Sequence, residues 1–219
     1  MKTLRDNSLG LLFFSLFVVT LILQAFVGLA DHNRILAIDE LPPVDIAHFV
    51  TSSEFAVDVA ENWQSEYLQF TLFILATVWL IQRGSPESKA DPTGTESDAD
   101  QQIGRYAGPE APRWARAGGL RAGLYGWSLG ALMAVLFLGS WVAQAITGSV
   151  AYNAELARDD QPPVSLVDYV FFTPDFWNRT LQNWQSEFLA VASMVVFSVY
   201  LRQRGSAESK PVGMPHEVA

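Results

Sequence analysis

The pentapeptide NWQSE occurs twice in this chain of 219 residues, at residues 62–66 and again at residues 183–187. An apolar run follows each copy and closes on a polar segment, which reads QRGSPESK in the first case and QRGSAESK in the second. Aligned at an offset of 121, the stretches 62–89 and 183–210 agree at 15 of 28 positions. Self-similarity at a fixed spacing indicates an internal duplication, so we interpret the chain as two copies of one unit.

The similarity continues toward the N-terminus at an offset of 120. Gln24 matches Gln144, and the double proline at 42–43 matches the one at 162–163. Each copy therefore consists of an apolar segment, a polar loop with a double proline, and a second apolar segment. We expect the first copy at residues 1–89 and the second copy at residues 120–210, joined by a polar linker at 90–119 and followed by a tail at 211–219.

Half of the residues are hydrophobic, and charges are nearly absent from four stretches. These stretches predict helices at about 9–30, 60–82, 124–148 and 181–203, with lengths close to the 20 or so residues that cross a bilayer. The expected fold is an all-α integral membrane protein with four transmembrane helices in two tandem hairpins. Because each copy has two helices, both copies enter the membrane in the same sense, as a parallel repeat.

The first apolar segment also has the features of a signal peptide. Its counterpart at 124–148 lies in the middle of the chain, where no signal peptide occurs, so we interpret the first segment as a retained helix.

The positive charges predict the orientation. Of the 14 Lys and Arg residues, 11 precede the first helix, lie between the second and third helices, or follow the fourth. The positive-inside rule then places both termini and the linker in the cytoplasm, in the cytoplasmic (inner) membrane of a bacterium. We expect the linker to be disordered, the tail to be flexible, and short interfacial helices to follow the double prolines of the outer loops.

The NWQSE motif lies at the outer end of its helix. Counted back from Arg83 at about 1.5 Å per residue, Glu66 lies about 25 Å away, which is just inside a hydrocarbon core of about 30 Å. Glu187 has the same separation from Arg204. Trp63 and Trp184 then lie at the outer interface, where we expect them to act as aromatic anchors.

Carboxylates inside the hydrocarbon are costly and face protein or water. The helical period places each motif Asn on the same face as its Glu, and the count of residues places two glutamines at a similar depth. The predicted intramembrane polar cluster comprises Gln24, Asn62, Glu66, Gln144, Asn183 and Glu187. In one interpretation these residues hydrogen-bond to one another and hold each hairpin together. In the other, the two glutamates hold a cation or share a proton.

A GxxxG pattern at Gly126 and Gly130 predicts close helix packing. Gly130 matches Gly10 in the first helix, so we expect the two helices that carry these glycines to pack together.

Several function classes lack support. The chain has no cysteine, three scattered histidines and a net charge of −9, which argue against disulfides, a metal site and nucleic acid as a partner. No nucleotide-binding or catalytic motif is present, so we expect no cofactor and no enzymatic activity. The expected partners are the lipid bilayer and either a second copy of the chain or another membrane protein.

Three features together resemble an uncharacterised family of bacterial integral membrane proteins, known as a domain of unknown function. They are LRDN at 4–7, the repeated NWQSE followed by an aromatic residue and Leu, and the exit QRGSxESK. The resemblance covers nearly the whole chain outside the linker and implies a membrane location and the fold described above. It implies no activity and no site residue.

Three functions are therefore open. The main expectation is a structural, regulatory or partner-binding membrane protein. The alternatives are a pathway for small cations or protons centred on Glu66 and Glu187, and a membrane enzyme.

Overall fold

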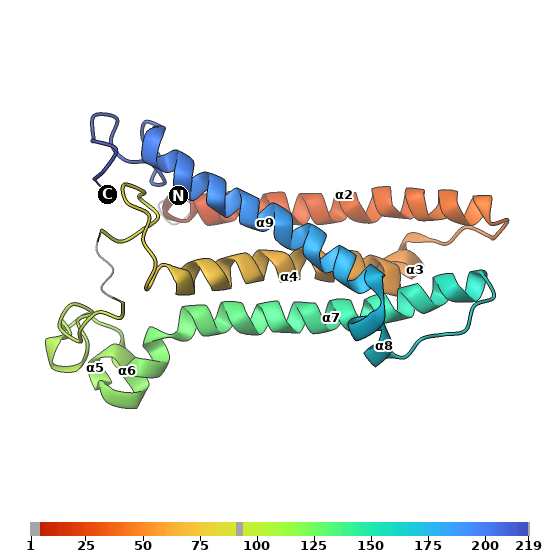
Figure 1. The fold of residues 1–219 in the computed structure, drawn as a ribbon, viewed down its shortest axis with the longest axis horizontal. Coiled ribbons are helices and arrows are strands. Elements are labelled where there is room, and N and C mark those ends of the chain that lie inside the picture. Colours follow the sequence, from red (N-terminus) through yellow and green to blue (C-terminus); the bar gives the residue numbers. More distant parts are fainter. Residues whose placement is uncertain (1–4, 91–93, 219) are drawn as a thin grey trace. The chain divides into compact units, whose positions relative to one another are not determined.

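The computed structural model describes residues 5–90 and 94–218, and these segments form helices and turns without any strand (Figure 1). Leu4 of the LRDN motif, three linker residues (91–93) and the last tail residue lie outside the described part. The all-α class is confirmed. The long helices are α2 (Ser8–Ile38), α4 (Ser53–Ala76), α7 (Ser128–Arg158) and α9 (Pro174–Tyr200). The short ones are α3 (Ile46–Val50), η1 (Gly104–Tyr106), α5 (Arg113–Ala117), α6 (Gly119–Gly126) and α8 (Leu166–Phe172).

By length and composition, two helices in the described segments could cross a membrane. They are α2 and α7, of 31 residues each, and no side chain in the most apolar part of α2 is buried. The other two predicted spans, α4 and α9, do not meet the same criterion. Charged side chains lie within each of these helices, including Glu61 and Glu66 in α4 and Arg179 and Glu187 in α9.

Helices α2 and α7 continue beyond the predicted ends at residues 30 and 148. Both end in the same left-handed cap, formed by Glu40 with φ 59° and by Asp160 with φ 53°. In the first cap the N–H of Leu41 donates to the Leu36 carbonyl at 2.8 Å, and in the second Gln161 donates to Leu156 at the same distance. Such bonds satisfy the last carbonyls of a helix and end it.

Helices α4 and α9 begin earlier than predicted, at residues 53 and 174 instead of 60 and 181. The Ser52 hydroxyl accepts a hydrogen bond from the N–H of Phe55 at 3.2 Å and so caps α4. Pro174 occupies the first turn of α9, where proline is favoured. Both helices also end before the predicted residues 82 and 203. After Ala76 the chain makes tighter bonds, as between the Trp79 N–H and the Ala76 carbonyl.

The chain folds into two compact units, and each is described by itself. The first unit comprises Met1–Val59 and Ala143–Leu166, and the second comprises Ala60–Val142 and Val167–Ala219. These units cut across the two predicted copies of the repeat.

Two equivalent asparagine clamps organise the loops of the first unit. The Asn33 side chain donates to the Val44 carbonyl at 3.0 Å and accepts from the Val44 N–H at 2.8 Å. Asn153 makes the same two bonds with Val164, at 3.0 and 2.8 Å. Each amide thereby replaces a backbone partner for the residue that follows the double proline and fixes the loop against its helix.

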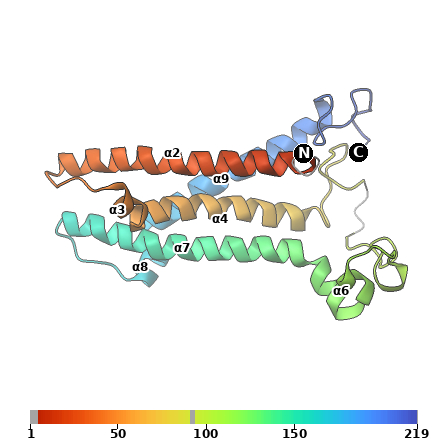
Figure 2. The ribbon, with the colours of Figure 1, turned by 180° about the vertical axis from the view of Figure 1, so that it is seen from behind.

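The second unit is built on α4, α7 and α9. Helices α4 and α7 run antiparallel and lie side by side in both ribbon views (Figures 1 and 2). Gly130 packs against α4 within this unit, where its nearest neighbours are Leu75 and Ile74. Gly10 belongs to the first unit, so its expected packing with the helix of Gly130 stays a prediction. The missing side chain at Gly130 lets α4 approach α7 closely.

Candidate functional site

The two NWQSE motifs meet in the second unit, one on α4 and the other on α9. Trp184 Nε1 donates a hydrogen bond to Gln64 Oε1 at 2.8 Å. The Ser65 hydroxyl lies 3.4 Å from the Glu187 carboxylate, to which it donates. Gln64 and Ser65 are fully buried, whereas their repeat mates Gln185 and Ser186 are exposed. The two copies of the motif therefore make different contacts.

An ion-pair network flanks these contacts toward the N-terminal ends of α4 and α9. Arg179 of α9 lies 3.2 Å from the Glu61 carboxylate of α4 and 3.2 Å from Asp175 on its own helix. Tyr169 donates to Asp175 at 2.7 Å. Burial, together with this bond, raises the pKa of Tyr169, so the phenol stays protonated and keeps donating. Residues 61, 64 and 65 of α4 contact residues 179, 184 and 187 of α9, in that order. Because the residue numbers rise along both helices in the same direction, α4 and α9 run parallel.

The two motif glutamates lie close enough for their charges to interact. Glu66 is exposed and Glu187 is half-buried. Asn183 donates to the Arg179 carbonyl within α9 at 2.9 Å, and Asn62 is exposed on α4. This part of the predicted cluster therefore comes together in one unit.

The predicted glutamines lie in the first unit. Gln24 is an exposed residue of α2, and Gln144 is a buried residue of α7. Their expected hydrogen bonds to Glu66 and Glu187 stay predictions.

The two predicted tryptophan anchors differ in surroundings. Trp63 is 41% exposed. Trp184 packs among the rings of Phe137, Trp141 and Phe188, with centroids 5.9 to 6.5 Å apart. The ring of Trp184 thus contributes to the packing of the second unit, and an interfacial role stays a prediction for both tryptophans.

The polar segments that follow α4 and α9, at 82–89 and 203–210, fold into the same turn, which we call the exit turn. Both contain a glycine with positive φ, Gly84 at 81° and Gly205 at 85°. Three hydrogen bonds recur in both turns. The N–H of Gln82 donates to Ser88 Oγ at 2.8 Å, as that of Gln203 does to Ser209 Oγ at 2.9 Å, and the N–H groups of Glu87 and Glu208 donate to Ser85 Oγ and Ser206 Oγ, both at 3.2 Å. The ammonium groups of Lys89 and Lys210 donate to the carbonyls of Gly94 and Pro215, both at 3.1 Å.

The first exit turn contacts the end of α9 and lies near the second exit turn. The Ser85 hydroxyl lies 3.1 Å from the Ser198 hydroxyl of α9, and the charge of Glu208 in the second turn acts on its repeat mate Glu87. Burial, followed by the hydrogen bond to Glu208 and its charge, raises the pKa of Glu87 to about 7. The recurrence of both glutamates in the repeat is the signal that could have identified them.

The chain after the second exit turn, expected to be flexible, folds back on the end of α9. The Lys210 ammonium donates to the carbonyls of Pro215, His216 and Val218 at 2.8 to 3.1 Å. Arg202 donates to the Met214 carbonyl at 3.0 Å. The backbone carbonyls of the tail thus accept hydrogen bonds from two cationic side chains that follow the last helix.

Comparisons with known proteins assign the chain to a family but not to an activity. No curated protein and no solved structure matches it. The whole chain, residues 1–219, matches the family described as Domain of unknown function (DUF6766), and the protein belongs to that family.

Proposed function

We propose that this member of the DUF6766 family is a multi-pass protein of the bacterial cytoplasmic membrane that serves a structural, regulatory or partner-binding role. The observation that carries the proposal is the use of the NWQSE side chains in joining α4 to α9. Gln64 binds Trp184, Ser65 binds Glu187, and the adjacent Glu61 binds Arg179. Polar residues used in this way hold helices together in a membrane.

The proposal includes a duplicated helical hairpin with four transmembrane helices. The matching asparagine clamps, left-handed helix caps and exit turns support the duplication, because unrelated segments do not make the same bonds at the same spacing. The exposed apolar side chains along α2 and α7 support insertion in lipid, since a water-soluble protein seldom exposes so large an apolar surface. We place both termini and the linker on the cytoplasmic side, as the distribution of Lys and Arg predicts.

A second candidate is a pathway for protons or small cations at Glu66 and Glu187. The proximity of the two acids favours it. The hydroxyls further along α4 favour the structural role instead. Thr71 and Thr77 donate to carbonyls of their own helix, at 2.6 and 3.0 Å, so they are engaged in local bonds. A conduit needs polar groups that face a shared path.

Flux into liposomes separates the two candidates. The purified protein and the double variant Glu66→Gln, Glu187→Gln are reconstituted, and proton and potassium entry is followed with dyes inside the vesicles. For a structural role we expect flux equal to that of protein-free vesicles in both cases, and a lower unfolding temperature for the double variant. Flux through the wild-type protein that the double variant loses, while it stays folded, would contradict the structural proposal. The exposed linker residue Glu110, changed to Gln, serves as the control.

A further inference from the structure

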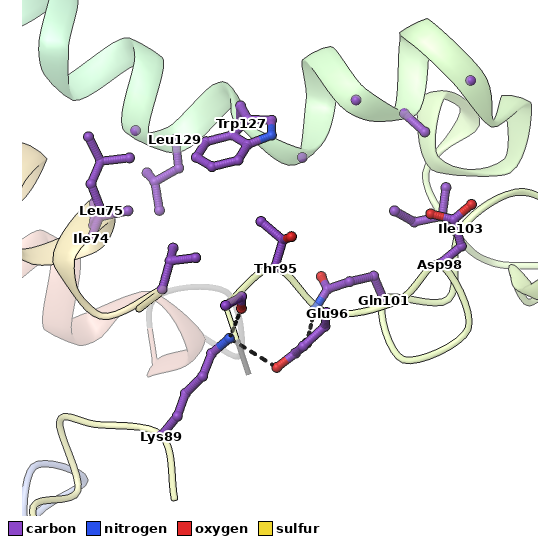
Figure 3. A pocket seen from close by; sticks show the side chains of 17 residues that line it. Ile74, Leu75, Lys89, Thr95, Glu96, Asp98, Gln101, Ile103, Trp127 and Leu129 are labelled. Atoms are coloured by element: carbon purple, nitrogen blue, oxygen red, sulfur yellow. Dashed lines mark hydrogen bonds and ion pairs between the residues drawn. The ribbon is translucent and has the colours of Figure 1, made fainter. Parts of the chain in front are cut away.

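A pocket of about 510 Å³ opens in the second unit, beside the C-terminal end of α4 (Figure 3). Its volume lies in the range of small-molecule sites, about 300–1,000 Å³. Three kinds of segment line it: the last residues of α4, the glycine-bearing helix α6 with the start of α7, and the linker from Gly94 to Ile103. All of them belong to the same unit.

One side of the pocket is apolar. Leu75 of α4 and Val78, just after α4, line this side. The Trp127 indole lines it from the chain between α6 and α7 (Figure 3). Trp127 is held in place by stacking on Trp79, with ring centroids 6.3 Å apart. At Gly123 and Gly126 an added Cβ would meet nothing within 4 Å, so the helix backbone itself borders open space. An apolar chain can therefore lie against α6 without displacing any side chain.

The other side is a polar rim with one uncompensated charge. The Lys89 ammonium pairs with the Glu96 carboxylate at 3.2 Å and donates to the Gly94 carbonyl at 3.1 Å. Gln101 donates to the same glutamate. The Asp98 side chain has no hydrogen bond or ion pair with any residue among 5–90 and 94–218. Within the described segments, the rim therefore offers a carboxylate without a bonded partner next to an apolar cavity.

We propose that this pocket binds an amphipathic amine, with its apolar chain between Trp127 and the glycine face of α6 and its ammonium group at Asp98. The charge of the rim selects the head group, because a carboxylate attracts a cation and repels an anion at short range. The glycines and the indole select the body, since an apolar chain gains by leaving water for such a surface.

Three six-carbon probes with different head groups test the proposal. Hexylamine, hexanol and hexanoate are titrated calorimetrically into the full-length protein in lipid nanodiscs, and the heat of empty nanodiscs is subtracted. We expect hexylamine to bind most tightly and hexanoate most weakly. The variant Asp98→Asn should weaken hexylamine binding by about threefold to fivefold, as the loss of a partly solvated ion pair does, and leave hexanol unchanged.

Filling the pocket provides an independent test. Gly123→Leu projects a side chain into the open space, and we expect it to abolish binding of all three probes. Gly139→Leu is the matched control, since Gly139 also lies in a helix with nothing within 4 Å of an added Cβ but does not line the pocket. Three results would each overturn the proposal. They are equal heats from empty nanodiscs and from nanodiscs that contain the protein, equal binding by the two leucine variants, and equal affinity for hexylamine and hexanoate. Unfolding temperatures show whether each variant is folded.

Discussion

Gln64 is fully buried in α4, and its amide oxygen accepts the hydrogen bond of the Trp184 indole. Replacing Gln64 by Ala leaves that indole N–H unpaired and a void beside it, so we expect a loss of about 1–3 kcal/mol in the free energy of unfolding. Gln185→Ala makes the same change at the exposed repeat mate and should stay within about 0.5 kcal/mol of the wild type. Reversible unfolding in mixed micelles measures both values. Equal losses for the two variants would contradict the asymmetric contact.

The Glu87–Glu208 pair makes stability depend on pH near neutrality. The pKa of Glu87 is about 7 in the folded protein and about 4.3 for an unperturbed glutamate, so the folded state binds more protons between these values. The stabilisation is therefore fully present below about pH 4.3 and is lost as the pH rises through about 7.

Unfolding temperatures between pH 5 and pH 8 check this effect. We expect the wild-type temperature to fall across the interval, and Glu87→Gln to remove most of that fall because an amide stays uncharged. A pH profile for Glu87→Gln that parallels the wild type would show that the pair does not cause the dependence. Glu110→Gln, in the linker, is the control for a change of net charge.

The exit turns carry the main prediction at the scale of structural elements. Gly84 and Gly205 share the left-handed conformation, which costs another residue about 1–2 kcal/mol. Only at Gly84 would an added Cβ meet another part of the chain, the His216 carbonyl oxygen at 1.8 Å, whereas at Gly205 nothing lies within 4 Å. The same substitution should therefore have a larger effect at the first turn.

We expect Gly84→Ala to reduce the free energy of unfolding more than Gly205→Ala, and to release the tail. Amide hydrogen exchange at Met214 reports that release, because its N–H donates to the Pro211 carbonyl in the tail segment that Lys210 and Arg202 hold through their bonds to tail carbonyls. Faster exchange in Gly84→Ala alone is the expected result. Faster exchange in both variants, or in neither, would show that the tail does not depend on contact with the first turn.

At the scale of the whole molecule, the proposed topology places the linker and the outer loops on opposite sides of the membrane. The absence of cysteine makes single-cysteine labelling free of background. We expect Asp159→Cys to react with a membrane-impermeant maleimide in intact spheroplasts, and Ala99→Cys to react only after the membrane is permeabilised. Both positions are exposed, so access does not require unfolding. Labelling of Ala99→Cys in intact spheroplasts would contradict the topology.

The helical class and the apolar segments α2 and α7 could be predicted from the sequence, because a hydrophobic run of that length indicates a helix without any knowledge of its tertiary contacts. The ends of the helices could not be predicted from hydropathy. Ser52 and Pro174, which begin α4 and α9, are polar or turn-forming residues outside the apolar runs, and their role depends on the backbone around them. The left-handed caps at Glu40 and Asp160 were missed for the same reason.

The NWQSE repeat shows most clearly which features depend on the sequence and which depend on the tertiary structure. The sequence by itself determined that the chain is helical, that it carries the same motif twice, and that the motif lies near the polar end of an apolar segment. Only the tertiary structure decided that Gln64 of one copy meets Trp184 of the other, and that Gln185 stays exposed. Identical pentapeptides have the same local preferences, so the difference between them comes from the side of each helix that packs against a neighbour. That side is set by contacts between residues more than 100 positions apart, such as Glu61 with Arg179 and Ser85 with Ser198.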